Sequence, residues 1–536
     1  MKRFWMNRVY AFLVSIFLSI FSTTVMSYIS MAAPIGPWIA PTLVLCASLL
    51  FSWVRSKESF TTTVALVTAA GSVGGIIATA FAFSFPAIYF LDSATFNRWL
   101  GNPWYFAQIM TGLSLAAGSF GIWIANLYED DLIQVQQLPF PIGQLIYKMI
   151  SAGNQVRKGI ELVVGFVSAT IISILQDGLF FKGFVPKAIT LLHARSLSVI
   201  SIPLLRFDLW PMLWAIGFVT GHVIAIPLLV GAISKIIIID PLNNVFFPSL
   251  NSMDFVLAFC SGMVLAGAAL GFLFSPQALW NSLKKYVDKN NTAYNFSRYT
   301  KNILIQGLIT ILICMGYLSY FGFGSLPIAL LLLASGICSY QLGEIAGKMG
   351  LAPLGRYATF VMVPAMLLFK LNAVQIIIIA TFVEIAGGVT ADILFSRKMA
   401  RLAHISRNKI MWYQYLGLLA SSLCIGVVFW LFISHLHLGS DTLFAYKAQS
   451  RALLVNAKQF NYFVLALGVL FGLFLKQIKM NPALVLGGLL MPLNLSLGLI
   501  VGGLLTLLTN NKEEYFPFWS GVFAANSIWM LIKALW

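Results

Sequence analysis

Long apolar runs follow one another along the whole chain, separated by short polar or charged stretches. A membrane-spanning helix needs about 20 mostly apolar residues. Runs of about that length lie at 9–31, 37–54, 62–91, 103–128, 159–180, 209–239, 253–275, 301–321, 325–347, 357–371, 373–395, 410–434, 460–476, 482–508 and 517–535. Two shorter pieces, 139–152 and 196–206, are bounded by Pro or charge, and half-helices or re-entrant segments are expected there.

This pattern predicts an all-α, polytopic integral membrane protein with about 16 transmembrane helices. Broken or re-entrant segments and internal pseudo-symmetry are expected within a single transmembrane domain over residues 1–536. Composition agrees, because 59% of residues are hydrophobic and 10% are charged, whereas soluble domains carry about 25% charged residues. No polar stretch is long enough for a separate soluble domain.

The net charge of +17 does not indicate nucleic-acid binding, because Lys and Arg lie in short loops between apolar runs. Such loops are retained on the cytoplasmic side. Basic clusters occur near the N-terminus, at 55–57, at 284–301, at 397–409 and at 476–479. The helix count between them allows all five to be cytoplasmic. The N-terminus is then inside, 436–458 is the largest outside loop, and 129–131 is an acidic loop inside. Short loops and little soluble sequence favour a bacterial inner membrane.

Proline and glycine interrupt several apolar runs. Such breaks occur at 138–143, at 203–227, at 350–355 and at 492–494. Irregular backbone at membrane depth persists only where protein or a water-filled cavity satisfies its polar groups. Interrupted segments in both halves of a chain are typical of transporter binding sites. The alternative is that these prolines only kink helices.

Ionisable residues within the apolar runs are few, which makes each one informative. Glu384 and Asp392 are eight residues apart, about two helical turns, so they share one face with Gly387 and Gly388 between them. A carboxyl in an apolar cavity is able to carry a proton. The alternatives are that Asp392 caps the cytoplasmic helix end, that Glu384 pairs with a neighbour, and that the glycines only allow close packing. His222 is either a pathway residue or a hydrogen-bonded packing residue.

Five stretches in order resemble motifs of one family. They are Glu58 with Ala69–Gly75 and Phe85-Pro86-Ala87, Leu138–Gly143, Gly347–Pro353, Ile385–Ile393, and Met491–Leu497 followed by Gly502-Gly503. On these residues the chain resembles, nearly end to end, the oligopeptide transporter family, which includes the yellow-stripe-like metal-chelate carriers. The resemblance implies a secondary carrier of about 16 helices that couples to protons and moves small peptides or metal chelates.

The chain departs from the family pattern at several carboxyls. Lys348 stands where the family has Glu, Gly388 and Ala391 replace an Asp and a Gln, and Ala525-Asn526 replaces Gly-Glu. If these positions face the substrate path, a more anionic substrate is expected, or proton coupling through Glu384 or Glu344.

The leading hypothesis is therefore a proton-coupled symporter of short oligopeptides or peptide-like metal chelates. Candidate substrate-path residues are Pro139, Pro141, Gly143, His222, Gly347, Lys348, Pro353, Gly387, Gly388, Pro492 and Asn494. Candidate proton-coupling residues are Glu384, Asp392 and Glu344.

The sequence lacks catalytic, nucleotide-binding and metal-spacing motifs, and its five cysteines stand singly. We therefore expect no enzyme activity, cofactor or metal site. A membrane-embedded enzyme, a lipid-processing protein and a channel are the alternatives. The oligomeric state stays open, with a homodimer as one option.

Overall fold

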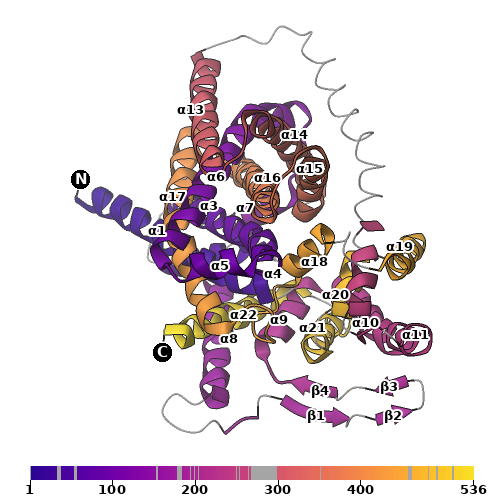
Figure 1. Cartoon of the computed structure of the whole chain (residues 1–536). Helices are drawn as coiled ribbons and strands as arrows, with labels where there is room; N and C mark the ends of the chain where they lie inside the picture. Colours follow the sequence, from indigo (N-terminus) through magenta and orange to yellow (C-terminus); the bar gives the residue numbers. More distant parts are fainter. Residues whose placement is uncertain are drawn as a thin grey trace. The chain divides into compact units, whose positions relative to one another are not determined.

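The structure is a computed structural model. It describes residues 2–32, 38–52, 57–151, 155–177, 184–186, 188–192, 195–197, 200–202, 205–248, 250–252, 254–263, 265–266, 298–349, 352–456, 461–480, 482–490, 493–509 and 512–535. Helices dominate this part of the chain (Figure 1). Nine helices of the described residues are long and apolar enough to cross a membrane, and several shorter apolar helices accompany them. The polytopic, all-α class is confirmed, and the count of about 16 stays a prediction.

The chain divides into two compact units, and each is described by itself. Unit 1 comprises Met1–Ser27, Trp38–Val156 and Gly271–Trp430. Its helices are most of α1 (Lys2–Ala32), α2 (Ala40–Leu50), α3 (Lys57–Ser84), α4 (Ala87–Leu91), α5 (Ser93–Leu100), α6 (Pro103–Glu129) with the π-helix η1 (Asp130–Val135), α7 (Pro141–Ser151), α13 (Arg298–Tyr320), α14 (Ser325–Met349), α15 (Leu354–Leu368), α16 (Ala373–Leu402) and most of α17 (Arg407–Leu436).

Helix α16 forms the centre of unit 1, where α3, α6, α7, α14 and α15 all pack against it. Asn372 caps its N-terminus through a reciprocal capping box with Gln375. The most apolar windows of α3 and α16 are wholly buried inside the protein. Both helices are rich in Ala, Gly, Ser and Thr, and such small residues let helix backbones approach closely where lipid provides no hydrophobic drive between helices.

Unit 2 comprises Tyr28–Pro37, Arg157–Leu270 and Leu431–Trp536. Its helices are α8 (Gln155–Asp177), α9 (Pro211–Thr220), α10 (His222–Ser234), the π-helix η2 (Lys235–Ile239), α11 (Asp240–Phe246), Asp254–Met263, α18 (Tyr446–Val455), α19 (Tyr462–Gln477), α20 (Pro482–Leu490), α21 (Leu493–Leu505) and α22 (Lys512–Leu535). Its strands are β1 (Ala188–Leu192), β2 (Arg195–Leu197), β3 (Ile200–Ile202) and β4 (Leu205–Asp208).

The strands correct one prediction from sequence. A half-helix or re-entrant segment at 196–206 was expected, and this is wrong. β1 pairs antiparallel with β4 from Ala188 opposite Asp208, with an irregularity between Thr190 and Leu192, and β2 pairs antiparallel with β3. These strands contain Ile189, Ile200 and Ile202, with Thr190 and Phe207, and such residues fit a pleated surface better than a helix.

Three further boundaries differ from expectation. The outside loop expected at 436–458 contains α18, whose Tyr446 is fully buried. The acidic loop expected at 129–131 is instead the end of α6 and the start of η1. The run at 62–91 is divided after Ser84, where Phe85 and Pro86 separate α3 from α4. The short helix expected at 139–152 is confirmed as α7.

Candidate functional site

The two carboxyls predicted to share a face of one helix lie deep in unit 1, between α16 and α3. Glu384 is 0% exposed and Asp392 is 2% exposed. The hydroxyl of Ser84 donates a hydrogen bond to Oε2 of Glu384. The hydroxyl of Ser72 donates to Oδ2 of Asp392 over 2.7 Å. The helix-end alternative for Asp392 is wrong, because α16 continues ten residues further, to Leu402.

Gly387 and Gly388 lie between these carboxyls and face two different helices. A Cβ at Gly387 would come 2.2 Å from Cδ1 of Leu342 on α14, and one at Gly388 would come 2.9 Å from Cγ1 of Ile76 on α3. Real Cβ atoms do not approach so closely, so both glycines allow α16 to pack tightly. This geometry accounts for the two glycines by packing.

The predicted motif at 138–143 folds back against α14 and α16. The amide of Phe140, at φ 47°, donates to the carbonyl of Gly347 over 2.7 Å. A Cβ at Gly143 would come 2.5 Å from the carbonyl oxygen of Phe395. Nζ of Lys398 donates to the carbonyl of Leu138 over 3.0 Å. Two stretches distant in sequence therefore meet beside the helix that carries Glu384 and Asp392.

The remaining candidates of unit 1 surround the same turn. Pro139 is exposed and its carbonyl accepts from Gln144, while Pro141 begins α7. Glu344 is buried on α14 at 7% exposure, and Pro353 stands at the N-cap of α15. Lys348 belongs to α14, and its side chain lies outside the described residues.

The described candidates of unit 2, His222 and Asn494, lie at or near the starts of two helices. Gly221, at φ 84°, separates α9 from α10, a backbone conformation that favours glycine. The carbonyl of Gly221 lies 3.0 Å from the position of a Cβ at Gly503, so the break packs against α21. His222 begins α10 and is exposed. Asn494 lies in the first turn of α21, and Pro492 lies outside the described residues.

Asn494 fixes the start of α21 to the strand β4. Its Nδ2 donates to Oδ2 of Asp208 over 2.8 Å. Burial raises the pKa of the Asp208 carboxyl, and the hydrogen bond from Asn494 partly opposes this. The amide therefore stabilises the charged form of a half-buried carboxylate.

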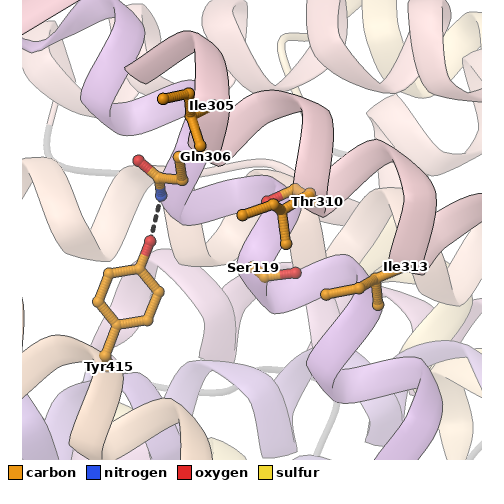
Figure 2. A pocket seen from close by; sticks show the side chains of 7 residues that line it. Ser119, Ile305, Gln306, Thr310, Ile313 and Tyr415 are labelled. Carbon is orange, nitrogen blue, oxygen red and sulfur yellow. Dashed lines mark hydrogen bonds between the residues drawn. The ribbon is translucent and has the colours of Figure 1, made fainter. Parts of the chain in front are cut away.

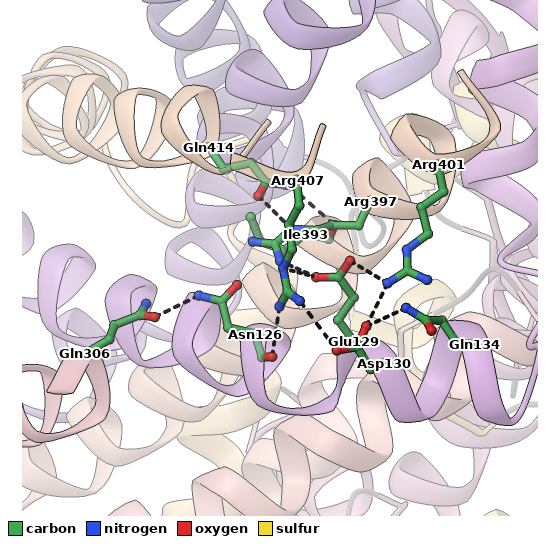
Figure 3. Close-up of polar contacts among 10 residues, drawn as sticks. All are labelled: Asn126, Glu129, Asp130, Gln134, Gln306, Ile393, Arg397, Arg401, Arg407 and Gln414. Carbon is green, nitrogen blue, oxygen red and sulfur yellow. Dashed lines mark hydrogen bonds and ion pairs between the residues drawn. The ribbon is translucent and has the colours of Figure 1, made fainter. Parts of the chain in front are cut away.

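Sequence reasoning missed a charge cluster at the end of α6, which Figure 3 shows. Glu129 is 2% exposed and forms ion pairs with three guanidinium groups. Nη1 of Arg397 binds its Oε2, Nη2 of Arg401 lies 3.0 Å from Oε1, and Nε of Arg407 lies 3.0 Å from Oε2. Asp130 adds pairs at 2.8 Å to Arg401 and at 3.5 Å to Arg407. A buried carboxylate requires such compensation.

Polar side chains extend this cluster in two directions. Nε of Arg397, itself 1% exposed, donates to Gln414 over 3.1 Å. Nη2 of Arg407 donates to the carbonyl of Asn126 over 3.1 Å, and Asn126 donates to Gln306 over 2.9 Å. The sequence did carry one signal for this cluster. The acidic run at 129–131 and the basic run at 397–407 have opposite charges, and the helix count places both on the same side of the membrane.

The comparison with protein families decides the class of this arrangement. The family model described as "OPT oligopeptide transporter protein" matches residues 8–525. The chain belongs to this family. It is accordingly a multi-pass membrane transporter of oligopeptides or related substrates. Among curated proteins, no relative matches the sequence at a significant level.

Proposed function

We propose that this oligopeptide transporter family member is a secondary active carrier that couples the movement of short peptides, or peptide-like metal chelates, to protons. The observation that carries the proposal is the pair of carboxyls on α16, Glu384 and Asp392. Both are buried in the core of unit 1, and a serine of α3 donates a hydrogen bond to each.

The energetics of burial support a protonation role for Asp392. An isolated ionised carboxylate costs a great deal of free energy in an apolar interior. Among the described residues, its recorded partner is the neutral hydroxyl of Ser72 and not a cation. Binding a proton neutralises the carboxyl, and releasing it restores a charge that favours water. A switch between these states is what a proton-coupled carrier needs.

The turn at 138–143 and the end of α14 are the proposed first part of the substrate path. Pro139, Pro141, Gly143, Gly347, Lys348 and Pro353 belong to it. A second set of proposed substrate contacts belongs to unit 2, at His222, Pro492 and Asn494. Irregular backbone of this kind is typical of sites where transporters bind substrate. The proposed location is a bacterial inner membrane, with the N-terminus and the Arg397–Arg407 cluster in the cytoplasm.

Uptake into proteoliposomes tests the coupling. Labelled tri- to pentapeptides and an iron chelate are offered with and without an inward proton gradient. Accumulation above the outside concentration is expected only with the gradient, which also excludes a channel. Asp392→Asn and Glu384→Gln should abolish accumulation while leaving counterflow exchange measurable.

The matched control is Asp92→Asn, which changes a carboxyl outside the core at the N-cap of α5. It should leave accumulation unchanged. Gradient-driven uptake that survives in both core variants would refute this assignment of the proton site. Failure of every peptide and chelate in folded wild-type protein would refute the proposed cargo.

Lys348 tests the charge of the substrate. If its cation faces the path, Lys348→Glu should shift preference from acidic toward basic peptides by roughly tenfold, the effect of about 1.4 kcal/mol. Competition of acidic, neutral and basic tripeptides against one labelled peptide measures this preference. An unchanged order of competition would contradict the role.

A further inference from the structure

An open cavity of about 420 Å³ lies on unit 1, away from the proposed substrate path. Its lining comes from three helices, with Ser119 on α6, Ile305, Gln306, Ile309, Thr310 and Ile313 on α13, and Tyr415 on α17. Figure 2 shows this pocket from close by. None of the candidate site residues lines it. Three isoleucines give its wall an aliphatic side, and Ser119, Thr310, Gln306 and Tyr415 supply polar groups. Gln306 donates to the hydroxyl of Tyr415 at one end.

The α13 side of this groove faces outward. Ile305, Ile309 and Ile313 are about half exposed, and the neighbouring Leu308 is 62% exposed. In a helix long and apolar enough to span a membrane, exposed aliphatic side chains of this kind meet lipid acyl chains. The groove is therefore a recess in an apolar, outward-facing surface of unit 1.

The end of the groove at Gln306 and Tyr415 joins the charge cluster through hydrogen bonds. Gln306 accepts from Asn126 over 2.9 Å, and the carbonyl of Asn126 accepts from Arg407 over 3.1 Å. Arg407 precedes Tyr415 by eight residues on α17, about 12 Å along the axis. Hydrogen bonds therefore link the cation of Arg407, through Asn126, to the Gln306 end of the groove.

The charge of the cluster favours an anion. Three guanidinium groups face the two carboxylates of Glu129 and Asp130, so these five residues carry one net positive charge. Nη2 of the buried Arg397 has no hydrogen-bond partner among the described residues. The side chain of Arg407 is 22% exposed, so it reaches the surface, whereas that of Arg397 is 1% exposed.

We propose that this groove is a binding site for one anionic phospholipid of the bilayer. An acyl chain lies along Ile305, Ile309 and Ile313, and the phosphate lies at Arg407. The recess alone accommodates any lipid chain, and the surplus positive charge at its end selects the anionic headgroup. Basic pockets between membrane helices bind anionic headgroups in this way.

Native mass spectrometry of the purified full chain tests this site. The protein is equilibrated in micelles with equal amounts of phosphatidylglycerol and phosphatidylethanolamine of identical chains. One bound phosphatidylglycerol is expected to predominate. Arg407→Gln should reduce its occupancy by roughly tenfold, as loss of a charge-assisted hydrogen bond predicts. Lys409→Gln, at an exposed cation of the same helix, should leave it unchanged.

A second pair of variants tests the groove without altering the charge cluster. Ile309→Trp fills the recess and should remove the bound lipid, whereas Leu308→Trp changes an exposed neighbour outside the lining and should retain it. Equal retention of both phospholipids in the wild type would overturn the proposal. So would retention in Ile309→Trp, or an equal loss in Lys409→Gln and Arg407→Gln, which would indicate diffuse attraction to the whole basic surface.

Discussion

Two helix seams of this protein are held together by different means. In unit 1, α3 and α16 are long, uninterrupted helices joined by the Ser72–Asp392 and Ser84–Glu384 hydrogen bonds. In unit 2, α10 packs against α20 by backbone contact, because Gly231 and Gly488 bring the two chains together. Among the described residues, no side-chain hydrogen bond joins that second pair. The α3–α16 seam combines these polar pairs with a close approach at Gly388, whereas the α10–α20 seam depends on its glycines alone.

The difference shows how a membrane protein substitutes for the hydrophobic effect. Lipid tails are as apolar as leucine, so helices associate through packing and hydrogen bonds. Unit 1 uses both packing and hydrogen bonds, and it also buries an ion pair between Glu129 and Arg397. Sensitivity to charge removal is therefore expected in unit 1, and sensitivity to added methyl groups is expected at the α10–α20 seam.

The largest effect is expected from Glu129→Leu. The substitution leaves three guanidinium groups of the cluster without their shared buried carboxylate, which should lower the free energy of unfolding by about 3–5 kcal/mol. Denaturant unfolding in micelles measures it. The double variant with Arg397→Met should recover part of the loss, and Arg98→Gln, at an exposed position, should have no effect. A loss below about 1 kcal/mol would contradict the charge-dependent character of unit 1.

A smaller effect is expected from Gly488→Ala. Its Cβ would lie 2.1 Å from the carbonyl oxygen of Leu228, so α10 and α20 must separate, at a cost of about 2–3 kcal/mol. Gly316→Ala is the matched control, because nothing lies within 4 Å of a Cβ there and alanine favours helix by up to about 1 kcal/mol. Equal stability of the two variants, measured by the same unfolding assay, would remove the distinction between the seams.

The smallest effect, and one that depends on pH, is expected from Asn494→Leu in unit 2. Losing the bond to the charged Asp208 should cost about 2 kcal/mol at neutral pH. Burial raises the pKa of the Asp208 carboxyl above its unfolded value of about 3.9. The stability that this carboxyl contributes is therefore fully present below the unfolded pKa, and it is lost as the pH rises through the raised pKa. Removing Asn494 should steepen that loss.

Unfolding midpoints across acidic to neutral pH measure this slope in the wild type and in Asn494→Leu. The matched control is Asp208→Asn, which should flatten the dependence in both backgrounds. Parallel curves for wild type and Asn494→Leu would show that the amide does not act through the charge of Asp208.

Most helices could be predicted from the sequence because length and apolarity suffice to identify them. The runs that became α6, α13, α14, α16 and α17 all correspond to single helices within a few residues at most boundaries. The strands at 188–208 could not be predicted by the same measure, since a short apolar run satisfies both a half-helix and a strand until its pairing partner is known.

The candidate site could be predicted only in part. The face shared by Glu384 and Asp392 followed from helical periodicity, but their serine partners on α3 lie 300 and 320 positions away in the sequence. The same limit explains why Glu129 was assigned to a loop. Its charge suggests solvent, and only the fold brings Arg397, Arg401 and Arg407 around it. Pairings between distant segments leave no periodic signal.

The sharing of Glu129 also sets an order for biogenesis. Arg397 follows Glu129 by 268 residues, so ribosomes adding about 5–20 residues per second need roughly 13–54 s to supply the first of its cations. During that interval α6 has emerged with a carboxylate that its final partners do not yet neutralise. The end of α6 must therefore wait at the aqueous boundary, or bind a proton, until α16 and α17 have been inserted. Closure of unit 1 is consequently a late step of membrane insertion, governed by translation speed as well as by energetics.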